Sequence, residues 1–169
     1  MEKRISSQKI IPNLWFDSEA EEAVKFYTSV FKNSKIGRIS RYTEAGIEQH
    51  QKPVGSAMTI EFTIEGQEFV ALNGGPVFTF NEAVSFVINC ETQEEVDYYW
   101  GKLTEGGDER AQVCGWLKDK FGVSWQVVPT VLNDMILDPD SQKVSRVLET
   151  MFQLKKLDIA PLKAAYEGR

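Results

Sequence analysis

Residues 56–76 read SAMTIEFTIEGQEFVALNGGP, and this stretch decides the fold. Apolar and polar side chains alternate over its first part, which is typical of a β-strand with one buried face; the apolar set is Met58, Ile60, Phe62 and Ile64. Glu65-Gly66 then makes a tight turn into a second strand over 67–73. Asn73-Gly74-Gly75-Pro76 ends that strand, because Gly and Pro interrupt a ladder of hydrogen bonds. The stretch therefore predicts an antiparallel hairpin.

The residues before the hairpin supply a strand, a helix and a further strand. Residues 9–16 and 35–42 have strand patterns. Between them, Ser18 and Glu21 have the spacing of a capping box and open a helix whose apolar stripe is Ala20, Ala23, Val24, Tyr27 and Phe31. Residues 8–76 thus form one βαβββ unit.

The same order of elements repeats in the second half of the chain. A strand over 83–90 is followed by a helix over 91–103 with a similar apolar stripe. The second βαβββ unit covers 82–129 and is completed by three short strands, at 110–113, 115–118 and 123–128. The repeat is one of element order and apolar spacing rather than of identical residues.

Residues 130–169 form a C-terminal helical extension. Asp138-Pro139 opens one amphipathic helix, and Asp158 precedes a last short helix. The apolar sides of these helices need a partner surface, which is either the chain's own sheet or a second subunit. We predict one α+β domain over residues 1–169, built from two βαβββ units and this extension.

The charge and the composition exclude several classes of protein. The net charge is −6 and the pI is about 4.9, which disfavours nucleic acid and anionic lipid. No apolar run approaches the roughly 20 residues of a membrane span, and no signal peptide is evident, so a cytoplasmic protein is expected. Cys90 and Cys114 have no metal-binding or redox spacing, and we expect both to be reduced.

Several short motifs, taken in order, resemble one family. They are Pro12-Asn-Leu-Trp-Phe-Asp17, Ala23-Val-Lys-Phe-Tyr27, Ala71-Leu-Asn-Gly-Gly-Pro76, Cys114-Gly-Trp-Leu-Lys-Asp119 and Gly122-Val-Ser-Trp-Gln-Val-Val-Pro129. Together they resemble the PhnB-like branch of the vicinal oxygen chelate superfamily, which includes glyoxalases, bleomycin-resistance proteins and extradiol dioxygenases. The resemblance implies paired curved sheets around a cavity, a homodimer, and, in the enzymes, a divalent metal held by His, Glu or Gln on the outer strands.

This chain does not match the metal-binding positions that the resemblance implies. The first strand offers Asn13, the fourth offers Ala71 and Asn73 on the side expected to face the cavity, and the fifth offers Ser85. Only Gln126, on the last strand, is a residue of the expected kind, and neutral amides alone bind zinc, iron or nickel poorly. We therefore expect no metal and no other cofactor.

A ligand site is nevertheless expected inside the sheets. Its predicted residues are Asn13, Trp15, Glu61, Asn73, Ser85, Trp116 and Gln126. Glu61 is the strongest candidate for a base or for a partner of a cationic ligand, although an exposed strand residue fits its pattern equally. The tryptophans are also explained by core packing, and His50 belongs either to a surface loop or to a lid over the cavity.

Three functions agree with these residues. The first is a metal-independent protein that binds a small apolar or cationic molecule, as bleomycin-resistance relatives do. The second is a metal-dependent lyase or dioxygenase with an unusual ligand set from Glu61, Gln126 and His50, and the third is a structural or regulatory dimer. Members of this branch are sometimes labelled 3-demethylubiquinone methyltransferases, but the Gly-rich turn of a doubly wound methyltransferase is absent from the sequence, so that activity is not expected.

Overall fold

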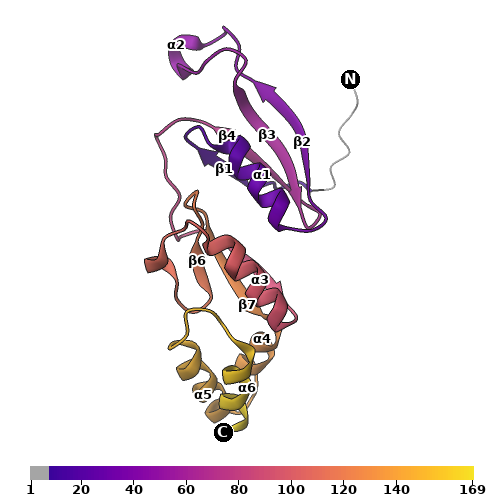
Figure 1. Ribbon diagram of the computed structural model, residues 1–169, viewed down its shortest axis with the longest axis vertical. Coiled ribbons are helices and arrows are strands. Elements are labelled where there is room, and N and C mark those ends of the chain that lie inside the picture. Colours follow the sequence, from indigo (N-terminus) through magenta and orange to yellow (C-terminus); the bar gives the residue numbers. More distant parts are fainter. Residues whose placement is uncertain (1–7) are drawn as a thin grey trace. The chain divides into compact units, whose positions relative to one another are not determined.

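The computed structural model describes residues 8–169, which fall into two compact units with their boundary between Thr79 and Phe80 (Figure 1). Each unit contains a small mixed sheet with one helix packed against it, so the α+β class is confirmed. The order of strand, helix and further strands repeats, but the second sheet has three strands where the first has four. In the described part of the chain, no helix is both long enough and apolar enough to cross a lipid bilayer.

The first unit has four strands in the order β1-β4-β3-β2. Its elements are β1 (Asn13–Phe16), α1 (Ala20–Val30), β2 (Lys35–Arg41), α2 (Ile47–His50), β3 (Ala57–Ile64) and β4 (Gln67–Asn73). The predicted hairpin is confirmed, because β3 and β4 pair antiparallel up to Ile64 and Gln67. Glu65 and Gly66 both have positive φ, the combination that a two-residue type I′ turn requires.

Helix α1 covers one face of this sheet and forms the core with it. Tyr27 on α1 is fully buried and stacks on Phe62 of β3, which stacks in turn on Phe69 of β4. We call the face turned away from α1 the far face of the first sheet. Its side chains are only partly buried or exposed; they include Asn13, Trp15, Thr59, Glu61, Thr63, Glu68, Val70 and Leu72.

The start of α1 differs from the prediction. The capping box from Ser18 to Glu21 does not form, and the helix has no cap from its own preceding side chain. Asn73, at the end of β4, accepts a hydrogen bond from the backbone N–H of Ala20 at 2.9 Å. A side chain 53 residues away in the sequence therefore satisfies one of the four unpaired N–H groups with which a helix begins.

The second unit has three strands in the order β5-β7-β6. Its elements up to the sheet's end are β5 (Phe86–Cys90), α3 (Gln93–Thr104), the 3₁₀ turn η1 (Glu109–Ala111), β6 (Trp116–Lys118) and β7 (Ser124–Pro129). The parallel pair of β5 and β7 corresponds to β1 and β4 of the first unit. Helix α3 packs one face of the sheet, and the opposite face is called the far face of the second sheet.

The prediction of a strand at 110–113 is wrong. Residues Glu109–Ala111 form a 3₁₀ turn, and only a single bridge joins Val113 to Trp116. The carboxylate of Asp108 accepts from the backbone N–H of Arg110 at 3.0 Å, and such a local bond competes with strand pairing.

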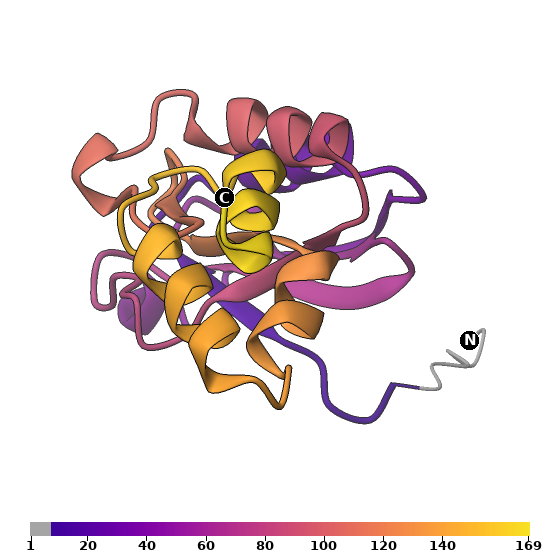
Figure 2. The same cartoon turned by 90° about the horizontal axis from the view of Figure 1, so that it is seen from below.

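The extension forms α4 (Thr130–Ile136), α5 (Ser141–Met151) and α6 (Ile159–Glu167). The helices predicted from Asp138-Pro139 and from Asp158 are confirmed, whereas α4 was not predicted. Figures 1 and 2 show α5 and α6 side by side, and the three helices share a core of Leu132, Met135, Val147, Leu157 and Leu162.

The extension is bound to its own unit. The backbone N–H groups of Cys114 and Gly115 donate to the carbonyl oxygens of Leu154 and Lys155, each at 2.8 Å. A Cβ on Gly115 would lie 2.7 Å from the Leu157 side chain, so the close approach requires glycine here. The sequence left open whether these helices pack against the chain's own sheet or against a second subunit. In the structure they pack against their own unit.

Candidate functional site

The far face of the first sheet brings together three of the residues predicted from the sequence. Asn13, Val70 and Glu61 lie opposite one another on β1, β4 and β3, and Trp15 lies beside Leu72 one pleat further along. Thr59, Glu61 and Thr63 of β3 give this face charged and hydroxyl groups, whereas its apolar side chains are Val70 and Leu72 of β4 and Trp15 of β1. A ligand on this face meets a polar side and an apolar side.

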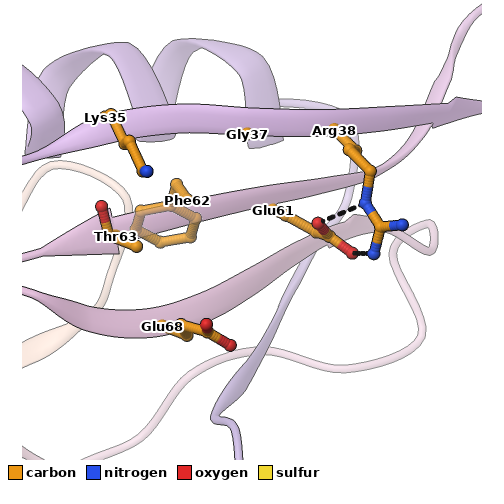
Figure 3. Close-up of a pocket in the computed structure, with 7 residues that line it drawn as sticks. All are labelled: Lys35, Gly37, Arg38, Glu61, Phe62, Thr63 and Glu68. Atoms are coloured by element: carbon orange, nitrogen blue, oxygen red, sulfur yellow. Dashed lines mark hydrogen bonds and ion pairs between the residues drawn. The ribbon is translucent and has the colours of Figure 1, made fainter. Parts of the chain in front are cut away.

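Glu61 lines a hollow of about 240 Å³ on this face, shown in Figure 3. The hollow is formed by β2, β3 and β4, and its lining residues are Lys35, Gly37, Arg38, Glu61, Phe62, Thr63 and Glu68. A second hollow of about 370 Å³ shares Lys35, Thr63 and Glu68 with it. The volume of the first is slightly below that of drug-sized ligand pockets, roughly 300 to 1,000 Å³, so it suits a small ligand or one end of a larger one.

Arg38 holds Glu61 with two parallel hydrogen bonds. Its Nε donates to Oε2 at 2.9 Å and its NH2 nitrogen donates to Oε1 at 2.7 Å, as Figure 3 shows. The Glu61 side chain is 23% exposed and that of Arg38 is 65% exposed. Hydrogen bonding to Glu61, and then the charge of Glu61, raise the pKa of Arg38 above its usual value.

This pairing changes the chemistry expected of Glu61. The sequence suggested a carboxylate that acts as a base or meets a cationic ligand, and both remain predictions. In the structure a protein cation already occupies that position, and two charge-assisted bonds favour the ionised carboxylate. Sequence reasoning missed Arg38 because the pairing of β2 with β3 shifts register between Ile36 and Ile39, which regular alternation does not reveal.

Trp15 lies on the far face but is packed by the segment after β4. Its indole N–H donates to the carbonyl oxygen of Gly75 at 2.8 Å, and its ring meets Phe78 edge to face with 5.0 Å between centroids. A Cβ on Gly74 would lie 2.3 Å from the indole ring. The Gly-Gly pair, considered as a turn in the sequence, therefore lets the chain pass directly over Trp15.

Asn73 does not lie on the far face, so the side assigned to it and to Ala71 was wrong. Its side chain is on the helix-covered face, where it bonds Ala20 and also donates from Nδ2 to the carbonyl oxygen of Ala57 at 3.1 Å. The Tyr42 hydroxyl donates to the backbone oxygen of Asn73 at 2.7 Å. In the structure the Asn73 side chain joins β4 to α1 and β3.

The second sheet brings the other three predicted residues together on its far face. Gln126 donates from Nε2 to the Ser85 hydroxyl at 2.9 Å, and Trp116 lies opposite Gln126 in the β6–β7 register. Lys118 on the same face contacts the carboxylate of Glu82, and this bond to Lys118 is the main reason that the pKa of Glu82 is lowered. Each unit thus carries its own group of predicted site residues.

His50 packs on an aromatic ring, and Cys90 is buried. The His50 ring lies on Tyr42 with 4.6 Å between centroids, and its Nδ1 accepts from the backbone N–H of Lys52 at 3.0 Å. Burial raises the pKa of Cys90 to about 12, which keeps the thiol protonated at neutral pH. Among residues 8–169 no three His, Cys, Asp or Glu side chains form a group able to hold a metal ion.

Comparisons with known proteins agree with this geometry. Residues 8–128 match a family model described as 3-demethylubiquinone-9 3-methyltransferase. The chain is similar to the PhnB protein of Bacillus cereus, with 38% identity, a TM-score of 0.63, and coverage of 73% of this chain and 100% of that one.

Two more distant structures share the fold. The protein PA1353 of Pseudomonas aeruginosa is 19% identical with a TM-score of 0.55, covering 73% of this chain and 98% of that one. The fosfomycin resistance protein FosX of Listeria monocytogenes is 16% identical with a TM-score of 0.51, covering 78% of this chain and 98% of that one. No curated protein matches the sequence significantly.

Proposed function

From the premise that this chain belongs to the 3-demethylubiquinone-9 3-methyltransferase (PhnB) family, with the fold of the vicinal oxygen chelate superfamily, we propose that it is a metal-independent small-molecule-binding protein. Each unit carries a candidate binding surface of its own: the far face of the first sheet in the first unit, and the Ser85, Trp116 and Gln126 group in the second. The ligand has an apolar body that lies against Val70, Leu72 and Trp15.

The hollow around Glu61 is the observation that carries this proposal. A carboxylate that served as metal ligand or base would present its oxygens to the ion or to the substrate. Here both oxygens accept from Arg38 instead. Beside the charged residues Lys35, Glu68 and Lys118, the polar residues on these faces are hydroxyls and amides, which suit hydrogen bonding to an organic ligand better than coordination of a transition metal.

The methyltransferase activity in the family's name is not part of our proposal. Methyl transfer from an adenosyl cofactor in a doubly wound fold uses a parallel sheet and a Gly-rich turn after its first strand. The two sheets of this chain are ordered β1-β4-β3-β2 and β5-β7-β6, each with one parallel pair among antiparallel ones. This arrangement supports a binding role rather than methyl transfer.

The proposal extends to a homodimer in the cytoplasm. Members of the family commonly assemble into oligomers, and Leu137 and Phe152 of the extension offer exposed apolar side chains to a second subunit. Light scattering should give twice the 19.2 kDa of one chain. A mass of one chain at micromolar concentration would contradict the dimer and leave the binding role in place.

Tryptophan fluorescence tests the binding role. Titration with a panel of aromatic compounds should quench emission saturably, because Trp15 and Trp116 lie on the proposed surface. Replacement of Trp15 by Phe should reduce the quenching, whereas Trp100→Phe on α3 is the matched control. Addition of EDTA should change neither result. Quenching that requires a stoichiometric divalent ion would support the metal-dependent lyase or dioxygenase instead, and no quenching across the panel would remove the binding role.

A further inference from the structure

The ring of His50 has surroundings that suit only its neutral form. His50 lies in the connection between β2 and β3, which carries α2 (Figure 1). Its Nδ1 accepts from the backbone N–H of Lys52 at 3.0 Å, so the proton of the neutral ring is on Nε2. Nε2 is buried and has no hydrogen-bond partner among the residues that the structure describes. In a protonated ring, one N–H would face the N–H of Lys52 and the other would find no acceptor.

The charged and titratable groups near this ring do not offset a positive charge on it. The Tyr42 ring, at the end of β2, lies with its centroid 4.6 Å from that of His50. The ammonium of Lys52, two residues further along the chain, lies 3.6 Å from a carboxylate oxygen of Asp17. Helix α2 itself carries Glu48. Within residues 8–169 no carboxylate forms an ion pair with His50.

Lys52 joins this connection to the residues that cover Trp15. Its ammonium donates to the backbone oxygen of Asp17 at 3.0 Å, and the same oxygen accepts from the N–H of Gly75 at 3.1 Å. A Cβ on Gly75 would lie 3.5 Å from the ammonium, so the two groups are neighbours. Gly75 in turn accepts from the indole N–H of Trp15 at 2.8 Å. A continuous set of contacts therefore runs from Lys52 to Trp15.

The backbone between His50 and Lys52 depends on the bond that joins them. Gln51 has a φ of 50°, in the left-handed region that residues with a side chain rarely adopt. Such a conformation persists only where the surrounding contacts favour it. The bond from Lys52 to Nδ1 closes the turn around Gln51, so its loss favours a different conformation of this turn.

We propose that His50 is a pH-sensitive latch for the connection over residues 43–56. With a neutral ring, the latch holds Lys52 against Asp17 and keeps the cover of Trp15 in place. Protonation replaces the acceptor at Nδ1 by a donor, so the bond to Lys52 is lost and the connection is released. The held conformation requires the unprotonated ring and the released one does not, so the held conformation is favoured at high pH and lost as the pH falls. The inference goes beyond the proposed binding function, because it concerns control of the Trp15 surface.

NMR without any ligand tests the latch. Histidine changes its charge in the range of about pH 5 to 8, so the spectra are compared at a high pH of about 8 and a low pH of about 5.5. His50 is the only histidine of the chain, and one ring signal therefore reports its protonation. The Lys52 amide and the Trp15 indole N–H signals should move together with the ring signal, and the ratio of released to held connection should rise about fivefold, as expected for the loss of one hydrogen bond. Movement of the ring signal alone would overturn the latch.

Three variants separate the latch from other effects of pH. His50→Asn keeps an acceptor oxygen near the position of Nδ1 and does not titrate, so the Trp15 signal should be the same at both pH values. Lys52→Gln removes the bond to Asp17, so the Trp15 signal at the high pH should already resemble that of the unmodified protein at the low pH. Lys25→Gln removes the same charge from the exposed side of α1 and should leave the titration unchanged. Movement of the Trp15 signal in His50→Asn as large as in the unmodified protein would contradict the latch.

A ligand titration distinguishes the latch from the binding role. Aromatic compounds that quench Trp15 should bind about fivefold more tightly at the low pH, because release uncovers the indole, and His50→Asn should abolish this difference. Equal affinity of the unmodified protein at the two pH values would overturn the latch as a control of this surface. No quenching at either pH would overturn the binding role alone, because the NMR measurements need no ligand.

Discussion

In both units a strand, a helix and a final strand that pairs parallel with the first recur in this order, but different buried polar side chains stabilise the two units. In the first unit, Asn73 is 8% exposed and links three separate elements, from the end of β4 to the start of α1 and to β3. In the second, Asp119 is 2% exposed and accepts hydrogen bonds from Phe121, Val123 and Trp125, which follow it closely in the sequence. Similar backbone pairing is therefore compatible with a long-range polar contact in one unit and a local one in the other.

The same contrast extends to the helices and to the far faces. Helix α1 takes its cap from the sheet, whereas α3 takes its cap from Thr92, whose hydroxyl accepts from the N–H of Glu95 at 3.3 Å. The far face of the first sheet carries the ion pair of Arg38 and Glu61 in a hollow, whereas that of the second carries the neutral pair of Gln126 and Ser85 beside the ion pair of Lys118 and Glu82. The two far faces therefore differ in which polar side chains they present.

The largest effect is expected from removal of Asp119. Its Oδ1 accepts from the N–H groups of Phe121 and Val123, and its Oδ2 accepts from the indole of Trp125 at 2.8 Å. Asp119→Ala leaves these donors without an acceptor, so the free energy of unfolding should fall by about 4 kcal/mol, given about 1 to 3 kcal/mol for each such buried group. Urea unfolding measures this change.

Two further variants make the Asp119 result specific. Asp119→Asn retains one acceptor oxygen but places an amide N–H against the indole donor, so its cost should be about 2 kcal/mol. Asp134→Ala on the exposed side of α4 removes a carboxylate from the same unit and should cost less than about 0.5 kcal/mol. If Asp119→Ala and Asp134→Ala lowered the free energy of unfolding equally, the buried hydrogen bonds of Asp119 would not contribute to stability.

Removal of the Asn73 side chain should have a smaller but more widely distributed effect. Asn73→Ala leaves the Ala20 N–H without its cap and the Ala57 carbonyl without a side-chain donor, at a combined cost of about 2.5 kcal/mol. Hydrogen exchange should accelerate both at the start of α1 and in β3. The matched variant Asn89→Ala, at an exposed position of β5, should change neither the free energy of unfolding nor the exchange rates in α1 and β3. Faster exchange at α1 alone would contradict a link between the three elements.

The fold was predictable from the sequence wherever structure follows from local pattern. Alternation gave the hairpin of β3 and β4, and its turn residues determine their own backbone conformation. The role of Asn73 was not predictable, because its polar side chain falls on the buried side of a strand and its partners lie 16 and 53 residues away. The sequence predicted a side-chain cap for the first helix, whereas it is the second that has one: Thr92 accepts from the N–H of Glu95, and the Glu95 carboxylate accepts from the N–H of Glu91.

The candidate site was partly predictable for the same reason. The sequence predicted one ligand site, whereas the structure places Asn13, Trp15 and Glu61 on the far face of the first sheet and Ser85, Trp116 and Gln126 on that of the second. Arg38 and Lys35 were missed, because the register shift that brings both to the hollow is a property of strand pairing. The charge of the ligand site therefore depends on tertiary structure.

The smallest effect is expected at the local cap of α3. Thr92→Ala removes the acceptor for the Glu95 N–H and should lower the free energy of unfolding by about 1 kcal/mol, while Thr92→Ser keeps the hydroxyl and should stay close to the unmodified protein. Because every bond of this cap lies within five residues, faster hydrogen exchange should be confined to the first turn of α3, in contrast to Asn73→Ala. Thr79→Ala, in the exposed segment after β4, is the control. If Thr92→Ala also accelerated exchange in β5 and β7, the cap of α3 would be coupled to its sheet as that of α1 is, and the contrast between a local and a long-range cap would no longer hold.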